Sequence, residues 1–366
     1  MLKGKFNIPL GSFLQLGTPP MIGVDISSSS VKMVELSAGQ KGGYVLEAYA
    51  IESLPKDAVV DGNINNLDAV TATLLRACGK LGSRVRNVCL ALPAAAVITK
   101  KIFLPAGLRE EDMEAQVEAE ANQYIPFALD EVNLDFQVVR EVENNPDEVE
   151  VLLAVSRKAN VEDRVAAAQS AGLKAVVMDV ETFAAAHAVE LICEQFPDHA
   201  ENECVALVDI GANVMSVNIL RNGQSVYTRD QQIGGDQLTQ QIHVQLGVSL
   251  EEAELGKRSG NLPESYETSV LEPFRETIAA EITRAIQFFF ASTPYNEVNY
   301  IVLAGGCAAL PGLDSAVASR TQVSTVVANP FARMGISSHL KGRHLATDAP
   351  ALLTACGLAL RRFDPS

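Results

Sequence analysis

Apolar residues recur along this chain with two periods, one of two residues and one of three to four. Two segments with the shorter period, 23–34 and 207–217, share one design: an apolar run ends in Asp-Ile, small residues follow, and an alternating run leaves. Alternation indicates strands, and small residues between them indicate a tight turn. Each segment therefore predicts a β-hairpin with an aspartate at the entrance of its turn. Two such hairpins far apart in sequence suggest a duplicated α/β domain.

The residues between the two hairpins predict a separate block, 88–175, with the order ββαββαβ. Its expected elements are strands at 88–92 and 96–104, a helix at 108–125, a hairpin of strands at 134–142 and 149–156, a helix at 160–170 and a strand at 175–178. The first helix has Met113, Val117 and Ala121 on one face and ends before Pro126. This order favours a small α+β subdomain beside the first lobe.

The chain after the second hairpin predicts the rest of a second lobe. The expected elements are a strand at 225–228, helices at 234–243, 251–258 and 273–292, a strand at 300–303, and helices at 313–320 and 352–361. We therefore expect an α/β fold of two duplicated lobes with an inserted α+β subdomain. The expected divisions are an arm at 1–20, the first lobe at 21–87, the insertion at 88–175, a connecting segment at 176–204, the second lobe at 205–350 and a C-terminal helix and tail at 351–366.

Composition narrows the classes of function. The chain has 366 residues, 48% of them hydrophobic and 20% charged, which is typical of a folded globular protein. Its net charge of −16 argues against general binding to nucleic acid or to anionic lipid headgroups. Six scattered cysteines without a CxxC pair indicate neither a zinc site nor a disulfide framework. No apolar run approaches the length of a membrane span, so we expect a soluble protein.

The turns of the two hairpins have the residue types that phosphate binding requires. A phosphate needs backbone N–H donors that can approach it closely, and small residues permit that approach. Residues 27–30 supply four serines, and Lys32 adds a positive charge; residues 211–213 supply Gly-Ala-Asn. Asp25 and Asp209, at the two turn entrances, are carboxylates suited to hold Mg²⁺ through water.

A third element follows the strand at 300–303. There Ala304, Gly305 and Gly306 lack large side chains, so a base and ribose could lie against the backbone. The three elements resemble, in order, the phosphate-1, phosphate-2 and adenosine motifs of the actin/Hsp70/sugar-kinase superfamily. The segment 22–36, IGVDISSSSVKMVEL, resembles the PilM family of cytoplasmic actin-like proteins of type IV pilus assembly, which is related to the division protein FtsA. The resemblance extends to residues 44–55, 123–127 and 234–236 and to the C-terminal helix.

The resemblance implies duplicated, ribonuclease H-like lobes around a nucleotide cleft, with ATP and Mg²⁺ as ligands. It also assigns a role to each candidate residue. Asp25 and Asp209 would hold Mg²⁺; Ser27, Ser28, Ser29, Lys32, Gly211, Ala212 and Asn213 would bind phosphate; Gly305, Gly306, Glu254 and Lys257 would contact the nucleoside; and Glu181 would lie near the attacking water. Ser27 departs from the pattern, because much of the superfamily has Gly there. Glu181 is the one candidate for a catalytic base, so we expect ATP binding with hydrolysis that is weak or depends on a partner.

The resemblance also implies partners. The first is the N-terminal cytoplasmic peptide of PilN, with indirect links to PilO, PilP and the secretion ATPases, and the expected place is the cytoplasmic face of the inner membrane. Membrane association would come through the partner alone, and self-association stays open. We expect no nucleic acid partner.

Other interpretations stay open. An isolated Asp-Ile-Gly turn or Gly-Gly pair is usually structural, and Glu181, Glu254 and Lys257 could be solvated helix charges. A small-molecule kinase of the same fold would need an aspartate base that the sequence does not offer. An FtsA-like division protein would need an amphipathic C-terminal helix, whereas this sequence stops soon after Arg361 and Arg362. An actin-like protein of type II secretion is the remaining alternative.

Overall fold

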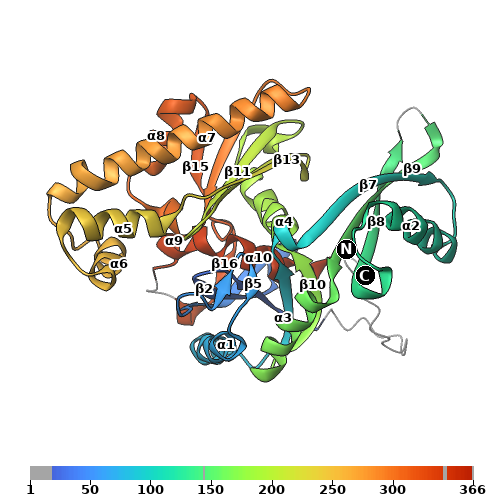
Figure 1. The fold of residues 1–366 in the computed structure, drawn as a ribbon, viewed down its shortest axis with the longest axis horizontal. Helices are drawn as coiled ribbons and strands as arrows, with labels where there is room; N and C mark the ends of the chain where they lie inside the picture. The colour runs from blue at the N-terminus through green and yellow to red at the C-terminus, as the bar shows by residue number, and fades with distance from the viewer. Residues whose placement is uncertain (1–18, 143–144, 341–343, 365–366) are drawn as a thin grey trace. The chain divides into compact units, whose positions relative to one another are not determined.

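The computed structural model describes residues 19–142, 145–340 and 344–364. The chain forms two compact units: one holds the residues up to 37, 47–184 and those from 358 on, and the other holds 38–46 and 185–357. The expected N-terminal arm, 1–20, lies outside the described residues except for its last two positions. Figure 1 shows the elements of both units.

The first unit is built on a mixed sheet. Its strands lie in the order β10 (Lys174–Val180), β6 (Asn87–Leu92), β1 (Ile22–Ile26), β2 (Ser30–Ala38) and β3 (Tyr44–Ser53). β1 and β2 form the expected antiparallel hairpin, and β6 runs parallel to β1. The short strands β4 (Val59–Val60) and β5 (Asn63–Ile64) pair with each other, and β16 (Gly335–Ile336) pairs with Val45 and Leu46 of β3.

Two helices, α1 (Leu67–Leu81) and α3 (Lys158–Ser170), pack against each other in the first unit. α1 is absent from the elements predicted above, although residues at both of its ends are typical helix caps. Asn66 accepts a hydrogen bond from the Ala69 amide, and Gly82 ends the helix with a φ of 70°. Leu74 of α1 and Ala168 of α3 are fully buried in the core that these helices share with the sheet.

A small three-stranded sheet forms a separate layer of the first unit (Figure 1). It comprises β7 (Val97–Pro105), β9 (Asn145–Arg157) and β8 (Val132–Val142), and α2 (Glu110–Tyr124) packs on one face. The order of elements matches the expected block, but its ends differ. β6 and β10 pair in the large sheet, and α3 packs on α1, so the separate layer spans only residues 97–157.

The second unit repeats the arrangement of the first. Its strand order is β13 (Gln224–Gln231), β12 (Met215–Arg221), β11 (Cys204–Ile210), β14 (Tyr300–Ala304) and β15 (Ser324–Val327). β11 and β12 form an antiparallel hairpin, and β14 runs parallel to β11, as β6 runs parallel to β1. The prediction of duplicated α/β lobes is therefore confirmed.

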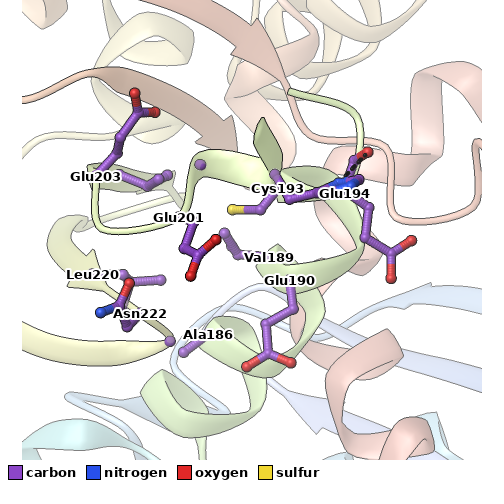
Figure 2. A pocket seen from close by; sticks show the side chains of 13 residues that line it. Ala186, Val189, Glu190, Cys193, Glu194, Glu201, Glu203, Leu220 and Asn222 are labelled. Carbon is purple, nitrogen blue, oxygen red and sulfur yellow. Dashed lines mark hydrogen bonds between the residues drawn. The ribbon is translucent and has the colours of Figure 1, made fainter. Parts of the chain in front are cut away.

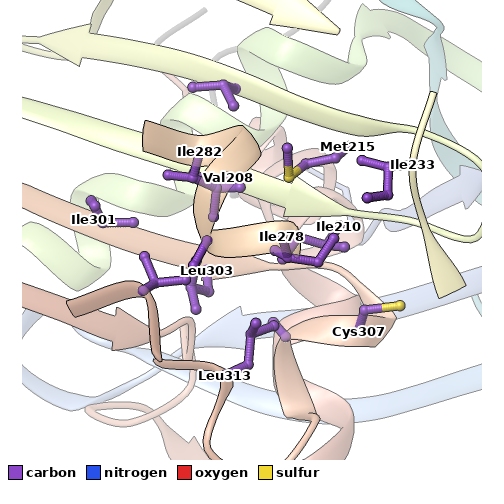
Figure 3. Packing of buried hydrophobic residues seen from close by; sticks show 14 of the residues in the cluster. Val208, Ile210, Met215, Ile233, Ile278, Ile282, Ile301, Leu303, Cys307 and Leu313 are labelled. Atoms are coloured by element: carbon purple, nitrogen blue, oxygen red, sulfur yellow. The ribbon is translucent and has the colours of Figure 1, made fainter. Parts of the chain in front are cut away.

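The helices of the second unit bury one face of this sheet. They are α5 (Gly235–Leu246), α6 (Leu250–Ser259), α7 (Glu272–Ser292) and α8 (Leu313–Thr321), and the short α9 (Leu345–Asp348) follows later. Ile278 and Ile282 of α7 pack among Val208, Leu303 and other strand residues (Figure 3). The helix predicted for residues 273–292 is therefore present as α7, and its apolar face packs in the core.

Two helices have their ends in different units. α4 (Glu181–Cys193) begins in the first unit and ends in the second, and α10 (Leu353–Leu360) runs from the second into the first. Directly after α10, Arg361 donates from Nε to Asp179 Oδ2 at 2.5 Å, which fixes the end of the chain on the first unit. Among the described residues, every helix is too short or too polar to cross a bilayer.

Neighbouring phenylalanines on α7 test the packing of the second unit. Phe289 is fully buried, so Phe289→Ala should lower the free energy of unfolding by about 3–5 kcal/mol because it leaves a cavity. Phe288 is 45% exposed, and Phe288→Ala should cost about 1 kcal/mol or less. Chemical denaturation followed by circular dichroism measures both values, and equal losses would contradict this packing.

Candidate functional site

The turn after β11 packs backbone to backbone against the start of α5. The Gly235 amide donates to the Gly211 carbonyl at 3.0 Å, and the Asp236 amide donates to the Ala212 carbonyl at 2.9 Å. A Cβ atom on Gly234 would lie only 2.4 Å from the Ala212 carbonyl oxygen. Glycine is therefore required at 234, and the first helix turn holds the predicted phosphate turn in place.

Asp209 lies beside the glycine pair that follows β14. Asp209 is in register with Ala304 on the neighbouring parallel strand. A Cβ atom on Gly305 would lie 2.4 Å from Asp209 Oδ1, and Gly305 has a φ of +84°, where glycine is favoured. Gly306 is exposed, and a Cβ atom there would meet only open space. The structure thus brings Asp209, Gly305 and Gly306 together.

Cys307 follows the glycine pair after β14 and contacts the turn after β11. Its Sγ atom lies 3.5 Å from the Gly211 carbonyl oxygen, and a Cβ atom on Gly235 would come within 2.7 Å of that sulfur. Burial raises the pKa of Cys307 to about 11, so the side chain is a neutral thiol that packs the site. The sequence analysis did not select Cys307, although it directly follows the predicted glycine pair.

Glu254 and Lys257, on α6, form a network with α5. Lys257 Nζ donates to the Gly235 carbonyl at 3.2 Å and to Thr239 Oγ1 at 2.7 Å, and it pairs with Glu254 Oε2 at 2.5 Å. Burial raises the pKa of Glu254, but hydrogen bonds from Lys257 and Thr239 and the charge of Lys257 outweigh it, so the pKa falls to about 2. The pair is therefore ionised and attached to the start of α5. Thr239 is not among the residues predicted from the sequence. Its position one helical turn after Gly235 places it on the same face of α5, which could have identified it.

The turn of the first hairpin is held by side chains. Lys32 Nζ lies 2.8 Å from Asp25 Oδ2 and 3.2 Å from Ser27 Oγ, and Ser27 Oγ donates to the Ser30 carbonyl at 2.9 Å. Ser28 and Ser29 are half-buried. No residue from 27 to 30, all of them described, has a positive φ. A serine at 27 therefore causes no backbone strain where the superfamily has glycine.

Arg164 is a buried cation in the first unit that the sequence analysis did not select. Its residue is 1% exposed, Nη2 donates to the Gly62 carbonyl at 2.6 Å, and Nε has no hydrogen-bond partner among the described residues. Burial lowers the pKa of Arg164, while the charges of Glu181 and Asp25 act to raise it. Glu181, at the start of α4, and Asp25 therefore both act electrostatically on this guanidinium. In the sequence, Arg164 precedes Ala167 by three residues and Ala168 by four, so the three share one face of a helix. This spacing could have indicated that Arg164 is buried.

The predicted residues fit a phosphate ligand better than a metal ion held by protein alone. Nowhere in the described chain do three or more His, Cys, Asp or Glu side chains gather into a metal site. Each unit instead offers one carboxylate at its turn, Asp25 or Asp209, and Mg²⁺ commonly completes its shell with water and phosphate oxygens. The open space at Gly306 gives a ligand access to backbone.

A separate cavity of about 360 Å³ lies in the second unit and contains none of the predicted residues (Figure 2). The end of α4 and the segment 199–205 line it together with the β12–β13 turn, and Glu190, Glu194, Glu201 and Glu203 make it acidic. An acidic cavity repels a triphosphate, so we assign it no part in the candidate site.

Comparisons with known proteins show where this chain belongs. A sequence model of the family described as type IV pilus assembly protein PilM matches residues 23–363. A solved PilM-PilN type IV pilus biogenesis complex is similar with a TM-score of 0.77 and 28% identity, covering 94% of this chain and 99% of that chain.

Two further relatives are more distant. The ethanolamine utilization protein EutJ from Carboxydothermus hydrogenoformans has a TM-score of 0.57 and 18% identity, covering 94% of this chain and 90% of EutJ. The cell division protein FtsA of Bacillus subtilis (strain 168) is 22% identical over 353 residues, which cover 84% of this chain and 78% of FtsA. The family match and the duplicated lobes together establish that this chain belongs to the PilM family of type IV pilus assembly proteins and has an actin-like fold.

Proposed function

We propose that this protein is an ATP-binding scaffold of type IV pilus assembly, recruited to the inner membrane by the cytoplasmic tail of PilN. Membership of the PilM family supports the role in pilus assembly. The observation that carries nucleotide binding is the contact of Asp209 with the Gly305 backbone beside the open position at Gly306. A carboxylate fixed next to exposed, side-chain-free backbone suits a phosphate with its divalent ion.

Each unit would contribute differently to binding. ATP would supply phosphates for the turns at 27–30 and 211–213, with Mg²⁺ near Asp25 and Asp209. Lys32 already forms an ion pair with Asp25 at 2.8 Å. In the bound state Lys32 would bind a phosphate and Asp25 the hydrated metal, so each charge would exchange one partner for another. Gly305, Gly306, Glu254 and Lys257 would form the nucleoside side of the site.

Hydrolysis would be slow in the isolated protein. Glu181 is the candidate to orient the attacking water, and the buried Arg164 attracts its charge electrostatically. Phosphoryl transfer depends on a well-positioned attacking water, and Glu181 is the one candidate that we propose to position it. We therefore propose that ATP turnover depends on a partner.

Removal of the Asp209 carboxylate tests nucleotide binding. Asp209→Ala should weaken Mg²⁺-dependent ATP binding about tenfold or more, which corresponds to about 1.4 kcal/mol. Isothermal titration with and without Mg²⁺ measures the effect. Asp230→Ala removes a carboxylate from the edge strand of the same sheet, where Ser216 donates to it, and should bind ATP as the wild type does. Equal affinities in wild type and Asp209→Ala would reject the assignment.

The small layer at 97–157 is the proposed binding element for PilN. The similar solved structure is a PilM-PilN complex, which supports PilN as the partner class. This layer contains no predicted nucleotide residue, and it buries its own core of residues such as Val117, Val151 and Leu153. A short apolar peptide could bind here through buried anchors and backbone pairing. Because the PilN tail is tethered in the membrane, moderate affinity would suffice for recruitment.

The strand register allows a clean deletion. Val97 and Ser156 are directly paired across β7 and β9, so residues 98–155 can be replaced by a short Gly-Gly link. The variant should lose binding of a synthetic N-terminal PilN peptide, measured by fluorescence anisotropy, and should keep ATP binding because both turns remain. Circular dichroism must show that it stays folded. A folded variant that still binds the peptide would place the PilN site elsewhere.

FtsA-like function is the second candidate, because 22% identity to FtsA extends over 353 residues. Deletion of the gene separates the two functions. Loss of surface pili with normal cell length, seen by electron microscopy, is expected here. Filamentous cells with intact pili would instead favour a role in division.

A further inference from the structure

The sheet of the second unit ends in an open edge. β13 is the last strand in its order, and within the described part of the chain it pairs only with β12. An edge strand presents a row of N–H and C=O groups that can pair with another chain. Its eight residues are long enough for a strand of average length to pair along them.

Aromatic rings and arginines line this edge. The Arg229 guanidinium lies 4.0 Å from the centroid of the Phe288 ring, and the Arg221 guanidinium lies 5.1 Å from that of Tyr295. Between them the Tyr227 ring is 5.6 Å from Phe289. We call Arg221, Tyr227, Arg229, Phe288 and Tyr295 the aromatic–arginine edge. Figure 1 shows β13 and α7, which carry most of it, in the same unit.

The two arginines of this edge lack counter-charges. The side chains of Arg221 and Arg229 make no ion pair or hydrogen bond with any described residue, although the chain has 45 acidic residues. A guanidinium stacked on a ring keeps its in-plane N–H donors available for a carboxylate. Asp230, next to Arg229, accepts a hydrogen bond from Ser216 instead.

We propose that the aromatic–arginine edge binds an acidic, extended segment of a partner protein. The segment pairs its backbone with β13, places carboxylates on Arg221 and Arg229, and rests an apolar side chain on Phe288. Strand addition to an edge takes affinity from main-chain hydrogen bonds and specificity from alternate side chains. Two arginines without a counter-charge give this edge a local positive charge on a protein whose net charge is −16, and this charge favours an acidic segment.

A competing explanation is that these arginines protect the exposed edge strand from aggregation. Charged residues on edge strands prevent aggregation, and Arg229 could do only that. A protective charge has no preference for acidic peptides and would work equally well as glutamate. The two explanations therefore differ in what happens when the sign of the charge is reversed.

The test uses the full-length protein and a fluorescein-labelled peptide, Glu-Thr-Phe-Thr-Glu-Thr-Phe-Thr-Glu, in fluorescence anisotropy. One face of this peptide carries Glu and Phe, as the edge requires. One control peptide has Lys in place of each Glu and tests the charge. A second control peptide has N-methylated backbone amides and tests the strand pairing. Arg229→Glu and Phe288→Ala test the edge, and Arg84→Glu, an exposed arginine of the first unit, is the control with the same charge change.

The wild type and Arg84→Glu should bind the acidic peptide with equal affinity and should bind neither control peptide. Arg229→Glu should weaken binding about tenfold or more, and Phe288→Ala by about fivefold. The proposal is overturned if the wild type shows no saturable binding. It is equally overturned if the Lys peptide binds as well, if Arg84→Glu loses as much as Arg229→Glu, or if the edge variants change only the oligomeric state.

Discussion

Close backbone packing around three glycines is the constraint on which the second unit depends. A Cβ atom on Gly234 would meet the Ala212 carbonyl too closely, and one on Gly305 would meet Asp209 Oδ1 and the Ile210 carbonyl too closely. A Cβ atom on Gly235 would instead meet Cys307 Sγ at 2.7 Å. These contacts join the β11–β12 hairpin, the start of α5 and the end of β14 at close range, so the turn at 211–213 has little freedom to rearrange.

The first unit positions its turn in a different way. Its hairpin has no glycine from 25 to 32, and Lys32, Asp25 and Ser27 hold the turn through an ion pair and a hydrogen bond. Such partners can be exchanged for a ligand, whereas a backbone contact cannot. One duplicated design thus gives one turn held by backbone contacts and one turn held by an ion pair and hydrogen bonds of its side chains.

The two proposed binding surfaces are built from residues other than those of the turns. The layer at 97–157 has its own core, and the aromatic–arginine edge lies on β12, β13 and the C-terminal part of α7 with its adjoining loop. Neither set shares a residue with the turns at 27–30 and 211–213, so a partner could bind either one without replacing a residue of these turns. The acidic surface keeps non-specific anionic partners away and leaves local features to decide specificity.

The sequence by itself determined the two hairpins, the periodic helices, the α/β class and the family, because these depend on local patterns of apolar, small and capping residues. Only the tertiary structure decided that β6 and β10 belong to the large sheet, since apolar strands look alike whichever sheet pairs them. It also decided the burial of Arg164, whose hydrogen-bond acceptor is 102 residues away, and the role of Thr239 between α5 and α6. Such contacts join residues that are distant in the chain. The position of each residue on its own helix could indicate burial, but it could not identify the partner.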